Sequence, residues 1–88
     1  MNEYRLAVDL EVLEQLLKTD EAQRQQIVDL LARLRHQPFL TGEFREIDDT
    51  GRSNEVVLAG NTLVFFWSDH AVKTVRVTKL EFIEDDQT

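Results

Sequence analysis

The sequence predicts an α+β fold in two layers, with a helical hairpin packed on a mostly antiparallel five-stranded sheet. Apolar residues recur at helical spacing between residues 10 and 34, and from residue 43 onward they alternate with a period of two. Residues 4–8 also alternate, which adds a strand before the helices. The 88 residues suffice for one modest core, so we expect a single domain at 1–83 and an acidic tail at 84–88.

The two helices are predicted from their caps and their apolar faces. Asp9 is placed to cap a short helix that carries leucines at 10, 13, 16 and 17. Asp20 and Gln23 fit a capping box for a second helix, which Pro38 ends. So little chain separates the helices that they form an antiparallel hairpin.

Four strands follow the helices. Residues 43–48 suit an edge strand, residues 49–51 a turn, and Gly60-Asn61 a tight hairpin. The other strands are expected at 55–59, 63–67 and 72–82, with the consecutive apolar residues 82 and 83 marking a bulge or the end of the last strand. We expect the helices to bury Leu13, Leu17, Ile27, Leu30, Leu31 and Leu34 against Val56, Leu58, Val64, Phe66, Val75 and Val77.

Composition excludes several functional classes. The chain has no cysteine, so disulfides, thiolate metal sites and cysteine nucleophiles are excluded. His36 and His70 lack ligand spacing, so we expect no metal, and we expect no cofactor. The net charge is -7 and no segment is basic, which disfavours nucleic-acid or ribosome contact. No run is long enough to span a membrane, and we expect a cytoplasmic protein.

Four polar residues are candidates for catalysis. Asp69 beside His70 is a possible proton-transfer pair, although a solvated turn has the same sequence. Lys73, Arg76 and Lys79 form the basic cluster of the sheet, but a period of two places Arg76 on the face opposite the two lysines. Arg52 follows the turn before the third strand and could line a cleft. The candidate catalytic residues are therefore Arg52, His70, Lys73 and Arg76.

Several apolar residues exceed what a small core readily hides. Phe65 and Trp67 share one face of a central strand and Phe66 faces the other way, which is typical of core packing. Two helices cover only one face of a sheet, so an exposed apolar surface is expected to bind a partner or a second copy. The acidic tail is expected to stay outside that surface. The expected partner-binding residues are Phe39, Leu40, Trp67, Leu80, Phe82 and Ile83.

Nearly the whole chain resembles the RelE/ParE superfamily of plasmid-stabilisation toxins. The resemblance rests on the order of elements and on the segments RLRHQPF, GEFREID, DTGR and EVVLAGNTLVFFWSDHAVKTVRV. It implies a sheet in which the first strand lies beside the last. RelE-type members cut messenger RNA on the ribosome and ParE-type members act on DNA gyrase, and a small antitoxin neutralises both.

The sequence also departs from the RelE nucleases of that superfamily. Ser53 and Glu55 stand near the positions of their lysines, and Thr62 matches the position of an arginine. Lys79 is the nearest basic residue to the C-terminus, and acidic residues follow it. We therefore expect a toxin-family protein that acts by protein binding, without RelE-type ribonuclease activity. The alternatives are an endoribonuclease with a non-standard site and a structural homodimerising domain.

Overall fold

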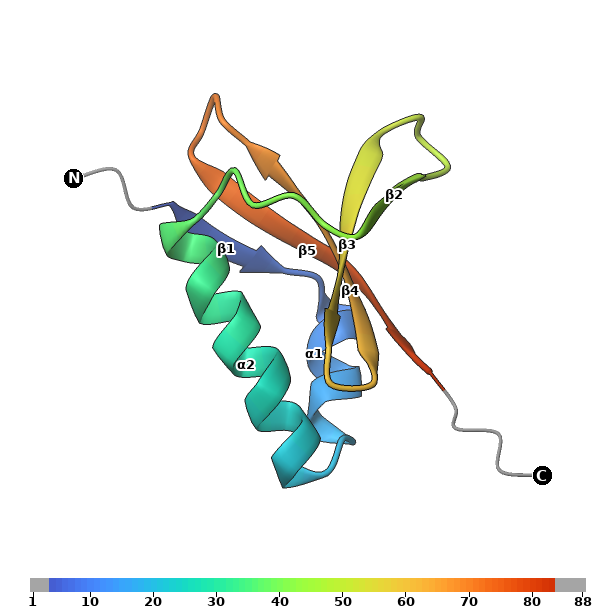
Figure 1. The fold of residues 1–88 in the computed structure, drawn as a ribbon. Coiled ribbons are helices and arrows are strands. Elements are labelled where there is room, and N and C mark those ends of the chain that lie inside the picture. The colour runs from blue at the N-terminus through green and yellow to red at the C-terminus, as the bar shows by residue number, and fades with distance from the viewer. Residues whose placement is uncertain (1–3, 84–88) are drawn as a thin grey trace.

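The computed structural model describes residues 4–83 as two helices and five strands (Figure 1). In chain order these are β1 (Arg5–Val8), α1 (Leu10–Leu17), α2 (Glu21–His36), β2 (Phe44–Ile47), β3 (Ser53–Ala59), β4 (Thr62–Asp69) and β5 (Thr74–Phe82). The predicted order of elements and the α+β class are confirmed. No helix among the described residues is long and apolar enough to cross a membrane.

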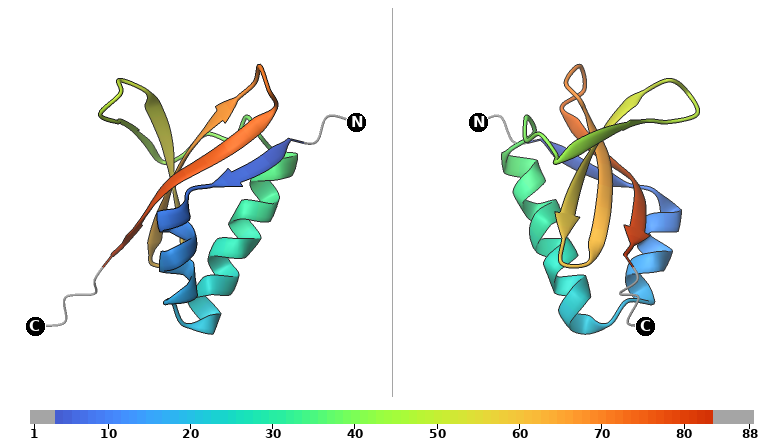
Figure 2. Two further views of the ribbon diagram at one scale, coloured as in Figure 1. Left: turned by 180° about the vertical axis from the view of Figure 1, so that it is seen from behind. Right: turned by 45° about the vertical axis from the view of Figure 1, so that its right-hand side comes forward.

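The five strands form one sheet in the order β1-β5-β4-β3-β2. β1 runs parallel to β5, and every other neighbouring pair is antiparallel. Both helices pack on the same side of this sheet (Figures 1 and 2). We call the side away from the helices the open face. The expectation that the first strand lies beside the last is therefore confirmed.

The second helix packs as its sequence predicts. Its buried residues are Ile27, Leu30, Leu31 and Leu34. Asp20 accepts a hydrogen bond from the backbone N–H of Gln23 at 2.9 Å, which confirms the N-cap. The Gln23 side chain does not complete a capping box but donates to the Ala59 carbonyl at 2.8 Å and to Thr62 Oγ1 at 2.7 Å. The start of α2 is thereby fixed to the β3–β4 hairpin.

The first helix buries a different face from the one predicted. Val12 and Leu16 enter the core, whereas Leu13 and Leu17 are exposed. Apolar residues lie on both sides of this short helix, so their spacing does not determine which side faces the sheet. The Asp9 side chain makes no capping hydrogen bond. The helix is fixed instead at its start by the Asp9 N–H, which donates to the Val77 carbonyl at 3.1 Å.

The prediction of the inner face of β3 is also wrong. Val57 and Ala59 belong to the core cluster, and Leu58 is exposed. Val56 is fully buried, but it lies on the open face opposite Phe65. Apolar residues on both faces of β3 made the assignment ambiguous. The remaining predicted strand contacts are confirmed, since Val64, Phe66, Val75 and Val77 belong to the core cluster.

Replacing Leu30 with alanine should lower the free energy of unfolding by about 2–5 kcal/mol, because this side chain is buried between α2 and the sheet. The matched substitution Leu17→Ala removes a leucine that is 78% exposed. It should change stability by less than about 0.5 kcal/mol. Urea denaturation measures both values, and equal losses would contradict the assignment of buried and exposed helix faces.

Candidate functional site

The sheet divides at one end into two arms. β3 and β4 pair from Ala59–Thr62 to Glu55–Phe66, and beyond this point each strand keeps only its outer neighbour. Ser53 then pairs with Ile47 of β2, while Trp67 pairs with Arg76 of β5. The arms diverge as a V in Figures 1 and 2.

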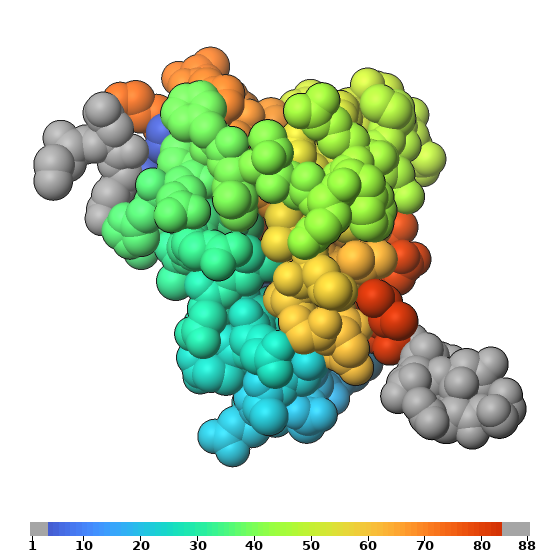
Figure 3. All heavy atoms as spheres, in the orientation of Figure 1, coloured from blue at the N-terminus to red at the C-terminus, as the bar shows by residue number. Residues whose placement is uncertain are grey.

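A cleft of about 360 Å³ lies between the arms and the segment that follows α2. This segment crosses the front of the molecule in Figure 3, where it is green, and it leads into the β2–β3 hairpin. Ser68 Oγ donates to the Pro38 carbonyl at 2.6 Å and holds the segment against β4. The cleft is lined by Pro38, Phe39, Leu40, Thr41, Arg45, Ser53, Glu55, Phe66, Trp67, Ser68 and His70.

A bulge in β5 changes which side chains share the open face. Phe65 pairs with Lys79 and Phe66 pairs with Val77, so Thr78 is the extra residue. This shift places Arg76 and Lys79 on the same face, beside Trp67 and Phe65. The expectation that Arg76 opposes Lys79 is therefore wrong, because it assumed an uninterrupted period of two.

Three cations lie against two aromatic rings on this face. The Arg52 guanidinium carbon is 3.7 Å from the centre of the Trp67 ring, and that of Arg76 is 5.8 Å from it. Lys79 Nζ lies 4.7 Å from the centre of the Phe65 ring. These five residues are called the cationic aromatic cluster below. Such contacts orient positive charge on an apolar surface, where anions and aromatic groups are both accommodated.

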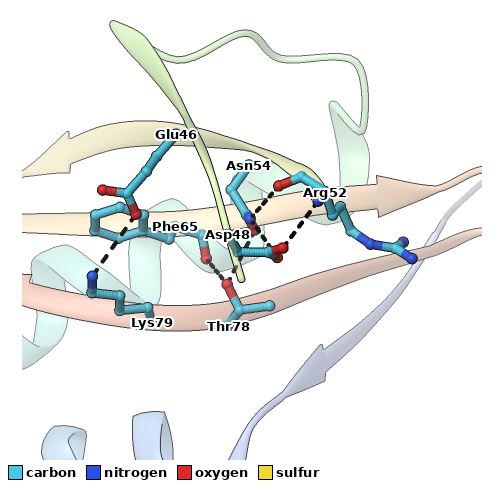
Figure 4. Close-up of polar contacts among 7 residues, drawn as sticks. All are labelled: Glu46, Asp48, Arg52, Asn54, Phe65, Thr78 and Lys79. Carbon is cyan, nitrogen blue, oxygen red and sulfur yellow. Dashed lines mark hydrogen bonds and ion pairs between the residues drawn. The ribbon is translucent and has the colours of Figure 1, made fainter. Parts of the chain in front are cut away.

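The Asp48 carboxylate orders the turn that carries Arg52. Its oxygens accept from the Thr50 hydroxyl at 2.6 Å, from the backbone N–H groups of Thr50 and Arg52, and from Asn54 Nδ2 at 3.0 Å. The hydrogen bond from the Thr50 side chain, followed by that from the Arg52 backbone, lowers the pKa of Asp48 to about 2. Asn54 Oδ1 in turn accepts from Thr78, which ties the turn to the bulge (Figure 4).

Lys79 also takes part in an ion pair with β2. Its Nζ lies 3.8 Å from Glu46 Oε1, and the two side chains meet beside Phe65 in Figure 4. Phe65 is only 3% exposed although neither of the two described helices covers the open face. Lys79 thus shields an aromatic ring and is partly neutralised, whereas Arg52 and Arg76 contact Trp67.

His70 lies away from the cationic aromatic cluster. Its Nδ1 is 2.7 Å from the Tyr4 hydroxyl, and its ring stacks on Phe39 with centroids 4.5 Å apart. These contacts join the β4–β5 turn to Tyr4, which directly precedes β1, and to the segment after α2. No contact with Asp69 is present, so the predicted pair of neighbours does not form a proton-transfer pair.

The four predicted catalytic residues therefore do not converge. Arg52 and Arg76 meet on Trp67, His70 packs on Phe39, and Lys73 lies in the β4–β5 turn with a φ of 52°. Among residues 4–83, no three histidine, aspartate or glutamate side chains are grouped so that they could ligate one metal ion.

Glu55 is neutralised inside the cleft. Its Oε2 accepts from Arg45 Nε at 2.8 Å, and its Oε1 accepts from the Gly42 N–H at 2.7 Å. Both carboxylate oxygens are thus engaged with groups of the protein itself. The pair fixes the segment after α2 against the β2–β3 arm and shapes the cleft.

The predicted partner-binding residues fall in two places. Phe39, Leu40 and Trp67 line the cleft, while Phe82 lines a hollow beside the turn between α1 and α2. Ile83 is exposed next to Phe82. Leu80 is 3% exposed and belongs to the core, so the expectation of a surface position is wrong for this residue. The acidic tail at 84–88 lies outside the described residues.

Sequence reasoning missed the Tyr4–His70 contact, the Arg45–Glu55 pair and the stacking of Arg52 on Trp67. The first and third join segments far apart in the chain, and no local pattern predicts them. The bulge did leave a signal, because the buried apolar residues of β5 are Val75, Val77 and then Leu80. A spacing of three inside an alternating strand indicates an inserted residue.

Comparison with solved structures identifies the architecture. A chain of the archaeal RelE–RelB complex from Pyrococcus horikoshii OT3 superposes with a TM-score of 0.75 and 15% identity, over 93% of this chain and 96% of the other. This chain has the RelE fold. A double arginine-to-alanine mutant of the E. coli toxin RelE in the free state gives 0.69 and 16% identity, over 91% and 83% of the two chains. No family model and no curated protein matches the sequence.

Three positions at which the sequence is expected to differ from the RelE nucleases make specific contacts or line the cleft in this structure. Thr62 is fully buried and accepts from Gln23, and Glu55 is paired with Arg45. Ser53 lines the cleft at the start of β3. Basic side chains at these three positions would require a different set of contacts around the β3–β4 hairpin and the cleft.

Acidification should loosen the turn that holds Arg52. The pKa of Asp48 is lowered from 3.8 to about 2, so its ionised form stabilises the fold above pH 3.8, and this contribution is lost as the pH falls through 2. Trp67 is the single tryptophan, and its fluorescence reports the contact with Arg52. We expect an emission change in this range.

Asp48→Asn should shift the Trp67 emission already at neutral pH. The matched variant Asp49→Asn changes the next residue of the same turn, whose carboxylate accepts none of the hydrogen bonds among the described residues. It should retain the wild-type emission and its pH dependence. Identical spectra for Asp48→Asn and the wild type would show that Asp48 does not position Arg52.

Proposed function

We propose that this protein is the toxin-type member of a toxin–antitoxin pair and that it acts by binding protein. The observation that carries the proposal is the RelE fold over 93% of the chain, shared with a component of a RelE–RelB complex. Fold alone does not determine activity, so the proposal also depends on the geometry of the site.

The surface supports binding rather than hydrolysis. The four candidate catalytic residues do not converge on one point, since only Arg52 and Arg76 share a neighbour, and both oxygens of the cleft carboxylate are engaged. In contrast, Phe39 is 73% exposed at the mouth of the cleft, and Phe44 and Leu58 are exposed on the open face. Apolar surface beside a cleft is typical of a docking site for another protein.

The edge strand β2 supports a heterologous partner over a second copy. All four of its residues are exposed, and its outer edge can accept a partner strand. Symmetric antiparallel pairing of two copies keeps the faces of the sheet aligned, so the two registers that pair most of β2 set Arg45 against Arg45 or Glu46 against Glu46. Like charges directly opposite one another disfavour that pairing.

Production of the protein in a bacterial host should arrest growth, and co-production of the protein encoded by the adjacent reading frame should restore growth. The two should co-purify. Phe39→Asp and Ile47→Lys should each weaken binding at least about tenfold, as expected of exposed anchors in an interface. Val72→Lys is the control, since Val72 is exposed in the β4–β5 turn. Unchanged affinity of the Phe39→Asp and Ile47→Lys variants for the partner would contradict the proposed surface.

A ribonuclease remains the second candidate because Arg52 and Arg76 meet on Trp67. An aromatic ring flanked by guanidinium groups can stack a base and contact phosphate. We nevertheless expect no cleavage of messenger RNA on programmed ribosomes or of free RNA, because no general base among residues 4–83 converges on this pair. Cleavage that disappears in Arg76→Ala, but persists in the exposed control Lys18→Ala, would establish the second candidate instead.

A further inference from the structure

Two arginines of the cationic aromatic cluster carry charge that the fold does not neutralise. Among residues 4–83, neither Arg52 nor Arg76 forms an ion pair with a carboxylate. Both residues are exposed, and both guanidinium groups lie at the ring of Trp67. In Figure 4 the Arg52 guanidinium points away from the Asp48 carboxylate, which binds the Arg52 backbone instead. The pair is therefore available to an anion, and guanidinium groups bind carboxylates through strong, charge-assisted hydrogen bonds.

The Trp67 ring connects this pair to the cleft between the two arms of the sheet. Trp67 lines the cleft, and so do Phe39 and Leu40 of the segment that follows α2. An anion held by the two guanidinium groups is therefore next to a partly apolar cleft of about 360 Å³. A ligand that occupies both places must carry negative charge beside an apolar group.

The cleft is also bordered by strand edges that lack a neighbour. Beyond the Glu55–Phe66 pair, β3 pairs only with β2 and β4 pairs only with β5. Ser53 of the first edge and Ser68 of the second both line the cleft. Successive residues of a strand point their backbone groups to alternate sides, so such an edge offers hydrogen bonds to an extended peptide. A phosphodiester backbone does not present that pattern of donors and acceptors.

The number of available cations favours a short acidic peptide over a nucleic acid. A nucleic acid carries one charge per nucleotide, and its binding normally neutralises several of them. Lys79 is paired with Glu46 and Arg45 with Glu55, which leaves two unpaired guanidinium groups beside Trp67 among the described residues. Repulsion by the net charge of -7 also grows with the charge of the ligand. A ligand with one or two carboxylates uses both arginines and meets the least repulsion.

We propose that the cationic aromatic cluster and the adjoining cleft bind an extended acidic segment of a protein partner, in which acidic and apolar residues alternate. Its carboxylates contact Arg52 and Arg76 on the open face. Because side chains of an extended segment point to alternate sides, its apolar residues then face the cleft. The inference rests on the proposed function in assuming a protein partner, and it names the charge and conformation of the segment. This contact is distinct from strand addition at the outer edge of β2.

Two capped pentapeptides test the proposal with the intact protein. One alternates leucine with glutamate and the other alternates leucine with glutamine, so they differ only in charge. Trp67 is the single tryptophan, and its fluorescence reports occupation of the cluster. The glutamate peptide should change this fluorescence to saturation, and the glutamine peptide should bind at least about tenfold more weakly. Added salt should weaken binding of the glutamate peptide, because exposed charges are screened.

Variants locate the binding site on the protein. Arg52→Gln and Arg76→Gln should each weaken binding of the glutamate peptide about tenfold, or about 1.4 kcal/mol. Arg33→Gln is the matched control, because it removes an exposed arginine of α2 and changes the net charge equally. It should leave the affinity nearly unchanged. Calorimetry supplies these affinities, since the loss of a guanidinium group also alters the Trp67 fluorescence of the free protein. Thermal unfolding should be similar in all three variants.

Three outcomes would overturn the proposal. The first is equal binding of the two peptides, or binding of neither. The second is a loss of affinity in Arg33→Gln equal to the losses in the two variants of the cluster. The third is tighter binding of a single-stranded oligouridine than of the glutamate peptide, removed by Arg76→Gln, which would show that the cluster binds nucleic acid. None of these tests uses the protein encoded by the adjacent reading frame, so they can fail while the proposed function holds.

Discussion

The inserted residue in β5 is the constraint on which the rest of the structure depends. Because Phe65 pairs with Lys79 and Phe66 with Val77, the strand changes phase at Thr78. Leu80 therefore points into the core between the sheet and the helices, and Lys79 points to the open face beside Arg76. The hydroxyl of Thr78 donates to Asn54, which holds the turn that places Arg52 over Trp67. This one inserted residue thus places Leu80 in the core and brings Arg76 and Lys79 to the same face as Arg52.

Periodicity predicted the helices and strands, but it could not predict which face of each one is buried. In α2 the apolar residues lie on one side only, so Ile27, Leu30, Leu31 and Leu34 are buried as expected. The short α1 and the strand β3 carry apolar residues on two sides. Their orientation depends on tertiary contacts, such as the Asp9 N–H on the Val77 carbonyl. Where both sides are apolar, only packing against the sheet decides which side is inside.

The candidate site was less predictable than the fold for a related reason. His70 was recognised as a possible reactive group, but its partners Tyr4 and Phe39 are distant in sequence. Arg52 and Arg76 were both named as candidates, yet their meeting on Trp67 depends on the bulge and on the Asp48 turn. Residue types can be read from a chain, whereas convergence is a property of register and long-range contacts.

The distribution of charge bears on which partners can approach. Several cations already make contacts within the fold, since Arg24 donates to the carbonyls of Leu16 and Thr19, Arg45 pairs with Glu55, and Lys79 pairs with Glu46. The chain has ten basic and seventeen acidic residues, so the electrostatic potential of the whole protein is negative. The attraction of Arg52 and Arg76 for an anion extends only about 8–10 Å at physiological salt. The net charge of -7 opposes a polyanion such as RNA over the same screened range, so this pair attracts RNA only against that repulsion.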